Sequence, residues 1–377
     1  MTNRRFSNTL ALKSLILATS ALGISMLSAA SHALPLEKIK LPPGFSISLY
    51  AENVENARQM ALGNKGTVFV GSRRAGNVYA LIDTNQDFKA DKQIRIASDL
   101  FMPSGLAYHQ GDLYVAEVDK IWHYRDIENS LPNIPAPELV YNKLPNDRHH
   151  GWKNIKFGPD GLLYVPVGAP CNVCDDPLPY SSIFKLDVTT KQATTVAQGV
   201  RNSVGFDFHP QTGELWFTDN GRDMMGDDLP DDELNRVTTQ GQHFGFPYVH
   251  NADVKDPEFY DAAKAKLNTP PELNLGAHVA ALGMEFYLGK QFPAQYQGSI
   301  FIAQHGSWNR SSKVGYRVMQ VTLDGSKVKE YKPFATGWLQ GEQSWGRPVA
   351  VLTLNDGSLL VSDDAANAVY RISYQAP

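Results

Sequence analysis

One short strand pattern, repeated six times, constrains the fold of this chain more than any other feature. In each copy an alternating apolar strand follows a turn rich in Gly, Asn and Asp, and another strand often comes next. The strands that mark the copies are VFVG (68–71), LYVA (113–116), LYVP (163–166), LWFT (215–218), IFIA (300–303) and LLVS (359–362). Their starts lie 45, 50, 52, 85 and 59 residues apart, near the roughly 40–50 residues of a propeller blade. We therefore expect an all-β, six-bladed β-propeller of four-stranded antiparallel blades.

A propeller brings distant parts of a chain together, because its blades close around an axis and their loops converge there. The 85-residue interval indicates a large insertion, roughly Phe244 to Leu282, which its prolines and acidic residues predict to be an irregular loop over one rim. The leading segment 41–63, LPPGFSISLYAENVENARQMALG, is expected to supply an outer strand that enters the first blade.

The first 33 residues have the composition of a secretory signal peptide. Arg4, Arg5 and Lys13 precede an apolar run over 15–30, and small residues follow at 31–33. The mature chain is then a single domain, 34–377, periplasmic or secreted, with no permanent membrane span. Removing this leader takes away three basic residues and no acidic one, so the net charge of −4 becomes about −7. A nucleic-acid partner is disfavoured, because it would require a basic face.

The only two cysteines, Cys171 and Cys174, lie in the segment GAPCNVCDD. In an oxidising compartment such a pair most simply forms a disulfide that tightens its own loop. Covalent haem would require a histidine after the second cysteine, where Asp175 stands, and a zinc site would require more ligands nearby. We expect a structural disulfide and no haem.

Two adjacent histidines, His149 and His150, precede a predicted hairpin in the third copy. The turn Gly158-Pro-Asp-Gly161 separates its two strands, so the histidines fall on the loop that enters the first strand. A histidine on such a loop can exchange protons near neutral pH. The alternative is a pair of surface histidines with no chemical role.

Further polar groups stand at the blade ends in the fourth, fifth and sixth copies. Arg201 and Asn202 precede a strand and offer fixed planar donors that suit a carboxylate or an oxyanion. Arg310 and Arg347 lie beside aromatic residues and are alternatively explained by packing at the rim. The segment 218–237, TDNGRDMMGDDLPDDELNRV, is either an irregular calcium loop or a solvated acidic loop. One histidine with several cations suits a polyanionic cofactor better than a metal cage.

These motifs, taken in order, resemble the soluble calcium- and pyrroloquinoline-quinone (PQQ)-dependent glucose/sorbosone dehydrogenases, which are six-bladed propellers. The chain is more similar to the sorbosone-type branch than to the glucose-oxidising branch. The motifs that carry the resemblance are the histidine ahead of FGPDG, GVRNSVGFDF (199–208), TDNGRD…DDELNRV, HFGFPYV (243–249) and GRPVAV…DGSLLVSD. They cover about two-thirds of the mature chain.

The resemblance implies roles for individual residues. His150 is the expected general base that takes the proton of the substrate hydroxyl as hydride moves to the quinone, and His149 replaces it if the register slips by one. Arg201 is expected to polarise the accepting quinone carbonyl. Asn202 and Arg347 are expected to hold the cofactor.

The expected calcium ligands are the backbone carbonyls of Gly221 and Arg222, although the family often has proline at the second position. The glucose-oxidising branch has Arg-x-Arg near its end, whereas only Arg347 is present here. Arg310 is a candidate for the cofactor-binding lysine of that branch, and its blade-two glutamine has no evident counterpart between Met102 and Gly105.

The resulting hypothesis is a quinoprotein that oxidises an aldose or a sugar aldehyde and passes electrons to a separate acceptor, a cytochrome or a quinone. Two alternatives stay open. A calcium-dependent lactonase would need acids that converge on the axis from several blades, whereas those of this chain crowd into one loop. A non-catalytic, ligand-binding propeller would leave the histidine and the Arg-Asn pair without a role.

Overall fold

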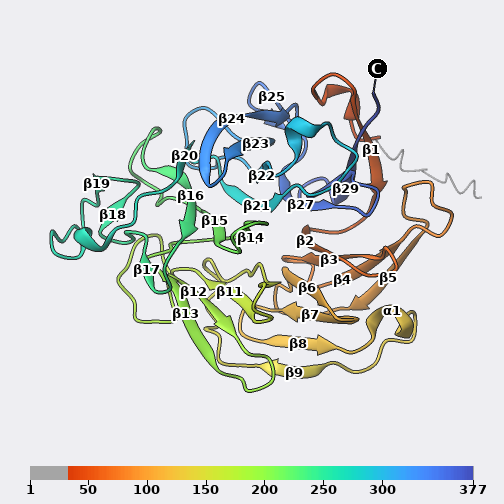
Figure 1. The fold of residues 1–377 in the computed structure, drawn as a ribbon, viewed down its shortest axis with the longest axis horizontal. Helices are drawn as coiled ribbons and strands as arrows, with labels where there is room; N and C mark the ends of the chain where they lie inside the picture. The colour runs from red at the N-terminus through yellow and green to blue at the C-terminus, as the bar shows by residue number, and fades with distance from the viewer. Residues whose placement is uncertain (1–32, 377) are drawn as a thin grey trace, which may run out of the picture. The chain divides into compact units, whose positions relative to one another are not determined.

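The computed structural model describes residues 33–376, and Pro35–Pro377 form one compact unit. The unit is almost entirely β-structure, and its six four-stranded antiparallel sheets are arranged as the blades of a propeller (Figure 1). The predicted fold is therefore confirmed. The leader expected over residues 1–33 lies outside the described residues, apart from Ala33.

The blades follow one another along the chain, and each begins at an inner strand near the axis. The first three blades consist of β2 (Ala57–Leu62), β3 (Val68–Ser72), β4 (Val78–Ile82) and β5 (Lys92–Ala97); β6 (Gly105–His109), β7 (Asp112–Ala116), β8 (Ile121–Tyr124) and β9 (Glu138–Tyr141); β10 (Lys156–Phe157), β11 (Leu163–Val167), β12 (Ser182–Leu186) and β13 (Ala193–Gln198). The last three consist of β14 (Gly205–Phe208), β15 (Leu215–Asp219), β16 (Asp231–Val237) and β20 (Leu273–Ala277); β21 (Ala281–Phe286), β22 (Ile300–Gln304), β23 (Arg317–Asp324) and β24 (Lys327–Ala335); β27 (Pro348–Thr353), β28 (Leu359–Asp363), β29 (Ala368–Tyr374) and β1 (Phe45–Ala51).

The leading strand closes the ring. β1 pairs antiparallel with β29, from Phe45 opposite Tyr374 to Ala51 opposite Val369, so it is the outer strand of the last blade. Figure 1 shows it beside β29, at the opposite end of the colour scale. The segment does supply an outer strand ahead of the first blade, as expected, but this strand belongs to the sixth blade and not to the first. It joins the sixth blade because β29 would otherwise present an unpaired edge.

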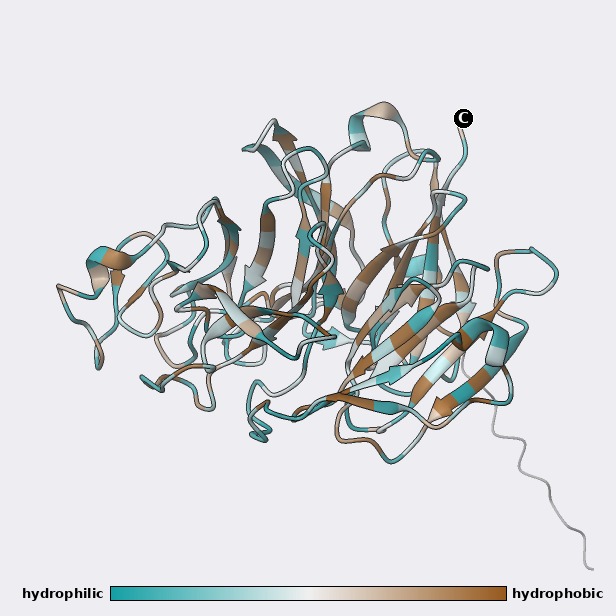
Figure 2. Ribbon diagram, turned by 60° about the horizontal axis from the view of Figure 1, so that its bottom comes forward, coloured by the Kyte–Doolittle hydropathy of each residue, from teal (hydrophilic) through white to brown (hydrophobic). Residues whose placement is uncertain are grey.

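Apolar side chains pack between neighbouring blades and not only within them. Five clusters of buried side chains join blades one to five in sequence and blade six to blade one. Between blades five and six, Phe45 packs against Phe292, Tyr296 and Phe334, with ring centroids 4.7–5.1 Å apart. In Figure 2 the apolar colour lies mostly on the strands and the polar colour mostly on the loops. The stacked blades therefore provide a rigid support for the loops at their ends.

The insertion of the fourth copy is smaller than expected. The chain leaves the blade after β16 and returns to it with β20, so the last residues of the predicted insertion belong to the sheet. In between lie β17 (Gln242–His243), which adds in parallel to β13, the hairpin β18 (Val249–His250) and β19 (Val254–Lys255), and a short 3₁₀ helix, η2 (Ala265–Leu267). Among the described residues, no helix has the length and apolar character that crossing a membrane requires.

Candidate active site

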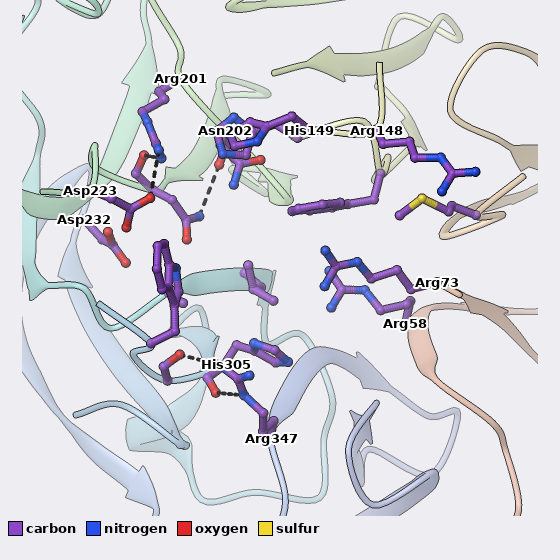
Figure 3. Close-up of a pocket in the computed structure, with 18 of the residues that line it drawn as sticks. Arg58, Arg73, Arg148, His149, Arg201, Asn202, Asp223, Asp232, His305 and Arg347 are labelled. Carbon is purple, nitrogen blue, oxygen red and sulfur yellow. Dashed lines mark hydrogen bonds and ion pairs between the residues drawn. The ribbon is translucent and has the colours of Figure 1, made fainter. Parts of the chain in front are cut away.

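A cavity of about 1080 Å³ lies where loops of the blades converge, at the upper end of the size range of ligand pockets. Its polar lining includes both predicted histidines and the Arg-Asn pair. The lining residues that matter for the chemistry below are Arg58, Arg73, Arg74, Arg148, His149, His150, Arg201, Asn202, Asn220, Gly221, Asp223, Asp232, His305 and Arg347. Figure 3 shows most of these side chains directed toward a common space. The propeller thus brings together residues almost 290 positions apart in the sequence.

His150 is buried in the wall of this cavity, with 7% of its surface exposed. Its Nδ1 lies 2.9 Å from the carbonyl oxygen of Ala169, which can only accept, so Nδ1 carries the proton and Nε2 is left with a free lone pair. Burial, and next the positive charge of Arg201, lower the pKa of His150 well below its usual value. The imidazole is therefore neutral at pH 7 and able to take up a proton at Nε2.

The backbone of His150 is also unusual, because its φ of 48° lies in the left-handed region that non-glycine residues rarely adopt. Such strain persists where the surrounding structure enforces it, and functional sites are common places for it. His149 is exposed, and its ring packs against that of His150 with centroids 4.1 Å apart. His150 is therefore the histidine that the fold holds in a fixed orientation.

The end of β11 holds His150 and Arg201 close together. The N–H of Ala169 donates to the carbonyl of Arg201 at 2.8 Å, while the carbonyl of Ala169 accepts from His150. Gly168 permits this approach, since a Cβ at its position would meet the Cβ of His150 at 2.5 Å and the carbonyl oxygen of Arg201 at 3.2 Å. The hairpin predicted in the third copy therefore fixes the spacing of the two residues.

Arg201 is clamped by groups from two loops. Its Nε donates to the carbonyl of Asn172 (2.8 Å) and its Nη2 to the side-chain oxygen of Asn172 (2.9 Å) and to Asp223 (3.2 Å). Its Nη1 donates to the carbonyls of Asn220 (3.1 Å) and Gly221 (2.8 Å). The side chain is only 4% exposed. The guanidinium is thus held in one orientation before any ligand binds.

The loop that carries Asn172 is closed by the disulfide between Cys171 and Cys174 that the sequence predicts. Asp176 lies near both sulfur atoms, but sulfurs bonded to each other provide no thiolate ligands for a metal. The side chain of Asn172 also joins Asp223, whose N–H it accepts at 2.9 Å. The disulfide therefore restrains a loop that directly positions Arg201.

Asn202 and Arg347 are also fixed in place, because each donates hydrogen bonds to acceptors in the surrounding structure. The backbone N–H groups of Arg201 and Asn202 donate to the buried carboxylate of Asp219 at 2.8 and 2.6 Å, and burial raises the pKa of that carboxyl to about 8. Arg347 donates to the carbonyls of His305 (3.0 Å) and Gly306 (2.6 Å). Neutral carbonyls leave the charge of Arg347 available to an anionic ligand.

Three cavity residues that the sequence analysis missed come from the first and fifth blades. Arg58 pairs with Asp364 at 3.0 Å, and Nε2 of His305 lies 2.7 Å from the other oxygen of that carboxylate. Arg73 stacks over the ring of Trp152, 3.9 Å from its centroid. Two of these residues, Arg73 and His305, directly follow the second strand of their blade, as Asn220 does in blade four. The sequence could therefore have indicated these two residues, because the position directly after a second strand can be read from the repeat.

The predicted metal ligands lie on the side of the cavity formed by blade four. The N–H of Gly221 donates to Asp232 at 3.0 Å, and its carbonyl already accepts from Arg201. The side chain of Arg222 turns away, toward Asp256 at 2.6 Å and Glu258 at 2.9 Å. Burial raises the pKa of Asp232 to about 7. Oxygen donors of the kind calcium binds are thus present here, beside a competing guanidinium.

The structure does not bring Arg310 into this cavity. Its guanidinium donates to the carbonyl of Asp227 and pairs with Asp228 at 3.0 Å. Two residues of the acidic loop therefore hold the half-buried Arg310 outside the cavity that the other predicted cofactor contacts line.

Comparisons with known proteins agree on the fold of this chain. A family model described as "Domain of unknown function (DUF7133)" matches residues 31–370. An uncharacterized protein of Borreliella burgdorferi is 38% identical over 352 residues, which cover 89% of this chain and 91% of that protein. The PQQ-dependent pyranose dehydrogenase of Coprinopsis cinerea is 32% identical over 415 residues, covering 90% of this chain. The chain spans only 55% of the length of that relative.

Solved structures extend the comparison. The calcium structure of a Trichoderma reesei Carbohydrate-Active Enzymes Family AA12 protein has a TM-score of 0.78 and 18% identity, covering 89% of this chain and 97% of that one. The PQQ-bound aldose sugar dehydrogenase of Streptomyces coelicolor has a TM-score of 0.65 and 16% identity, and the match covers 89% of this chain and 100% of that one. The structural neighbours are therefore PQQ-dependent sugar dehydrogenases, as the motifs indicated. At these identities the likeness establishes the fold alone.

Proposed function

Because this chain belongs to the DUF7133 family, whose function is unknown, its activity has to be inferred from the cavity, and we propose that it is a PQQ-dependent sugar dehydrogenase. The substrate would be an aldose or a sugar aldehyde of the sorbosone type. The observation that carries this proposal is a neutral, oriented His150 in one cavity with several fixed guanidiniums. The named activities of the fungal and bacterial relatives support it.

The donor set of the cavity fits PQQ, a planar quinone with three carboxylates. Arginine stays protonated at every relevant pH and pairs with carboxylates through two parallel hydrogen bonds. Arg347 makes no ion pair within residues 33–376, and Arg58 and Arg73 lie beside each other in Figure 3. We propose that these three hold the carboxylates and that Asn202 contacts the ring system. When bound, the quinone supplies an acceptor for the hydride of the sugar carbon.

The residues of the chain supply proton transfer and charge stabilisation. His150 takes the proton of the sugar hydroxyl at Nε2, and the Ala169 carbonyl stabilises the imidazolium that results. All five N–H groups of Arg201 already have acceptors, so its positive charge would stabilise the oxygen on which negative charge develops through the field at that oxygen and not through a new hydrogen bond. Because Asn172, Asp223 and two backbone carbonyls already hold it, this guanidinium requires little reorganisation during the reaction.

We propose that calcium binds on the blade-four side of the cavity, beside Gly221 and Asp232, with the carbonyls of Gly221 and Arg222 as ligands in place of the contact between Gly221 and Arg201. The excess of arginine elsewhere makes binding of the cation depend on an anionic cofactor, because guanidiniums alone repel it. We therefore propose that calcium and PQQ bind together. The disulfide of the Cys171 loop is in keeping with a periplasmic or secreted protein and a separate electron acceptor.

Dye reduction by the purified chain tests this function. Residues 34–377, mixed with calcium, PQQ and a panel of neutral and acidic sugars, are expected to reduce an artificial acceptor only when all components are present. If the chain binds PQQ and yet reduces no dye with any sugar, the proposal fails.

The hydrolytic alternative is less favoured, because the acids that line the described cavity, Asp223 and Asp232, both come from blade four.

A further inference from the structure

We propose, building on the function above, that the sugar oxidised by this chain carries a negatively charged group, a carboxylate or a phosphate. Arg74 and Arg148 at the cavity mouth would bind that group. This inference names the substrate class, which the proposed function leaves open.

The arginines of the cavity fall into two layers. Arg58 and Arg201 are buried and Arg73 and Arg347 are half-buried, whereas Arg74 and Arg148 are exposed. We call these last two residues the outer pair. Each of the two buried arginines is paired with an aspartate, and Arg347 is held by backbone carbonyls. Within residues 33–376 the guanidiniums of the outer pair make no hydrogen bond or ion pair, and that of Arg148 lies over the face of Phe101, 5.2 Å from its centroid.

The charges on the cavity walls are distributed unevenly. Figure 3 shows Arg58, Arg73 and Arg148 on one side, and Asp223 and Asp232 on the other. Arg74 follows Arg73 directly on the loop between β3 and β4, so the outer pair extends the cationic side toward solvent. On the second side Arg201 is paired with Asp223, so a ligand that spans the cavity would meet positive charge without an acidic partner mainly at the first.

The cofactor does not neutralise this excess. Six arginines line the cavity against two aspartates. Asp364, which pairs with Arg58, adds a third aspartate, so the three carboxylates of the quinone and one divalent cation leave an excess of about two positive charges, which raises the local concentration of anions. A neutral sugar would form no ion pair with these arginines, whereas an acidic sugar would place its negative charge beside the outer pair.

The mouth also offers apolar contacts suited to a sugar ring. Trp308 lines the cavity and is 69% exposed, a fraction that is high for a tryptophan, and Phe101 lies beneath Arg148. An exposed aromatic face such as that of Trp308 can bind the apolar face of a pyranose, and guanidiniums at the same mouth can bind a carboxylate or phosphate at the edge of the sugar. The combination fits an acidic monosaccharide.

Steady-state kinetics of the chain loaded with calcium and PQQ test the proposal with glucuronate, glucose 6-phosphate and glucose. Because the outer pair is exposed, each ion pair is worth little, and kcat/KM for an acidic sugar should exceed that for glucose by about tenfold. The ratio should fall toward one in the double variant Arg74→Gln/Arg148→Gln and at high salt. Comparing glucuronate with glucose 6-phosphate decides between carboxylate and phosphate.

A double variant of two exposed arginines outside the cavity, Arg95→Gln/Arg125→Gln, controls for net charge. If it lowers the ratio as much as the outer-pair variant does, or if glucose is preferred throughout, the inference is overturned. Calorimetric titration of the loaded chain with glucuronate separates this failure from that of the proposed function. Binding that the outer-pair variant loses, without turnover of any sugar, supports an acidic ligand and refutes the dehydrogenase.

Discussion

Replacing Asn172 by alanine should both destabilise the chain and slow its reaction, because this amide joins the disulfide loop to Arg201. The alanine variant loses the acceptor of Nη2 of Arg201 (2.9 Å) and of the Asp223 N–H (2.9 Å), and the donor to the Asp223 carbonyl (3.1 Å). It keeps the backbone carbonyl that accepts from Nε of Arg201. A hydrogen bond to a charged group is worth about 1.5–3 kcal/mol and a neutral one about 1 kcal/mol.

The free energy of unfolding should therefore fall by about 2–4 kcal/mol, as measured by denaturant titration. In the loaded enzyme kcat should fall by about 10–100-fold, because the misplaced guanidinium no longer meets the developing charge. Asn172→Asp keeps the acceptor for Arg201 and should recover most of the lost kcat. Val173→Ala, in the same loop, serves as the control. An alanine variant with the wild-type kcat would refute the positioning role, whatever its stability.

Three further predictions concern separate features of the chain. His150→Gln should lower kcat by about 10²–10⁴-fold, measured by dye reduction, while PQQ affinity stays within a few-fold. Replacing both Cys171 and Cys174 by serine should lower the free energy of unfolding by about 2 kcal/mol and also lower kcat, unless the loop holds its shape without the bond. Burial lowers the pKa of Lys153 to about 7, below its unfolded value. Between pH 7 and pH 9 the unfolded state therefore binds more protons than the folded state, so the stability of the wild type relative to Lys153→Met should rise with pH over this range. If the melting temperatures of the two proteins change equally with pH, the prediction is contradicted.

The blades could be predicted from the sequence because their signal is local. Each second strand, such as β11 or β28, alternates apolar residues beside a turn whose glycine adopts a positive φ, as Gly161 does at 76°. The closing strand β1 could not be placed, because its partner β29 lies more than 300 residues away and nothing near β1 identifies it.

The candidate site was predictable where a motif marks a loop, as for His150, Arg201 and Arg347. Arg58 was missed because it lies within a strand, β2, where a single charged residue resembles an ordinary surface position. Arg310, in contrast, lies on a loop at a blade end, where the sequence suggests a cofactor contact, yet it does not line the cavity. It lies five residues after His305, but Asp227 and Asp228 hold its guanidinium outside the cavity, and the sequence gives no sign of that distant contact.

Equilibrium titration of the metal-loaded chain with PQQ, followed by absorbance, tests most directly whether these residues surround a single anionic cofactor. We predict saturation at one equivalent, with affinity at least about tenfold weaker in Arg347→Gln, since that guanidinium donates to two backbone carbonyls and makes no ion pair with any described residue. Absence of saturable binding, or equal affinity in the variant and the wild type, would contradict the account.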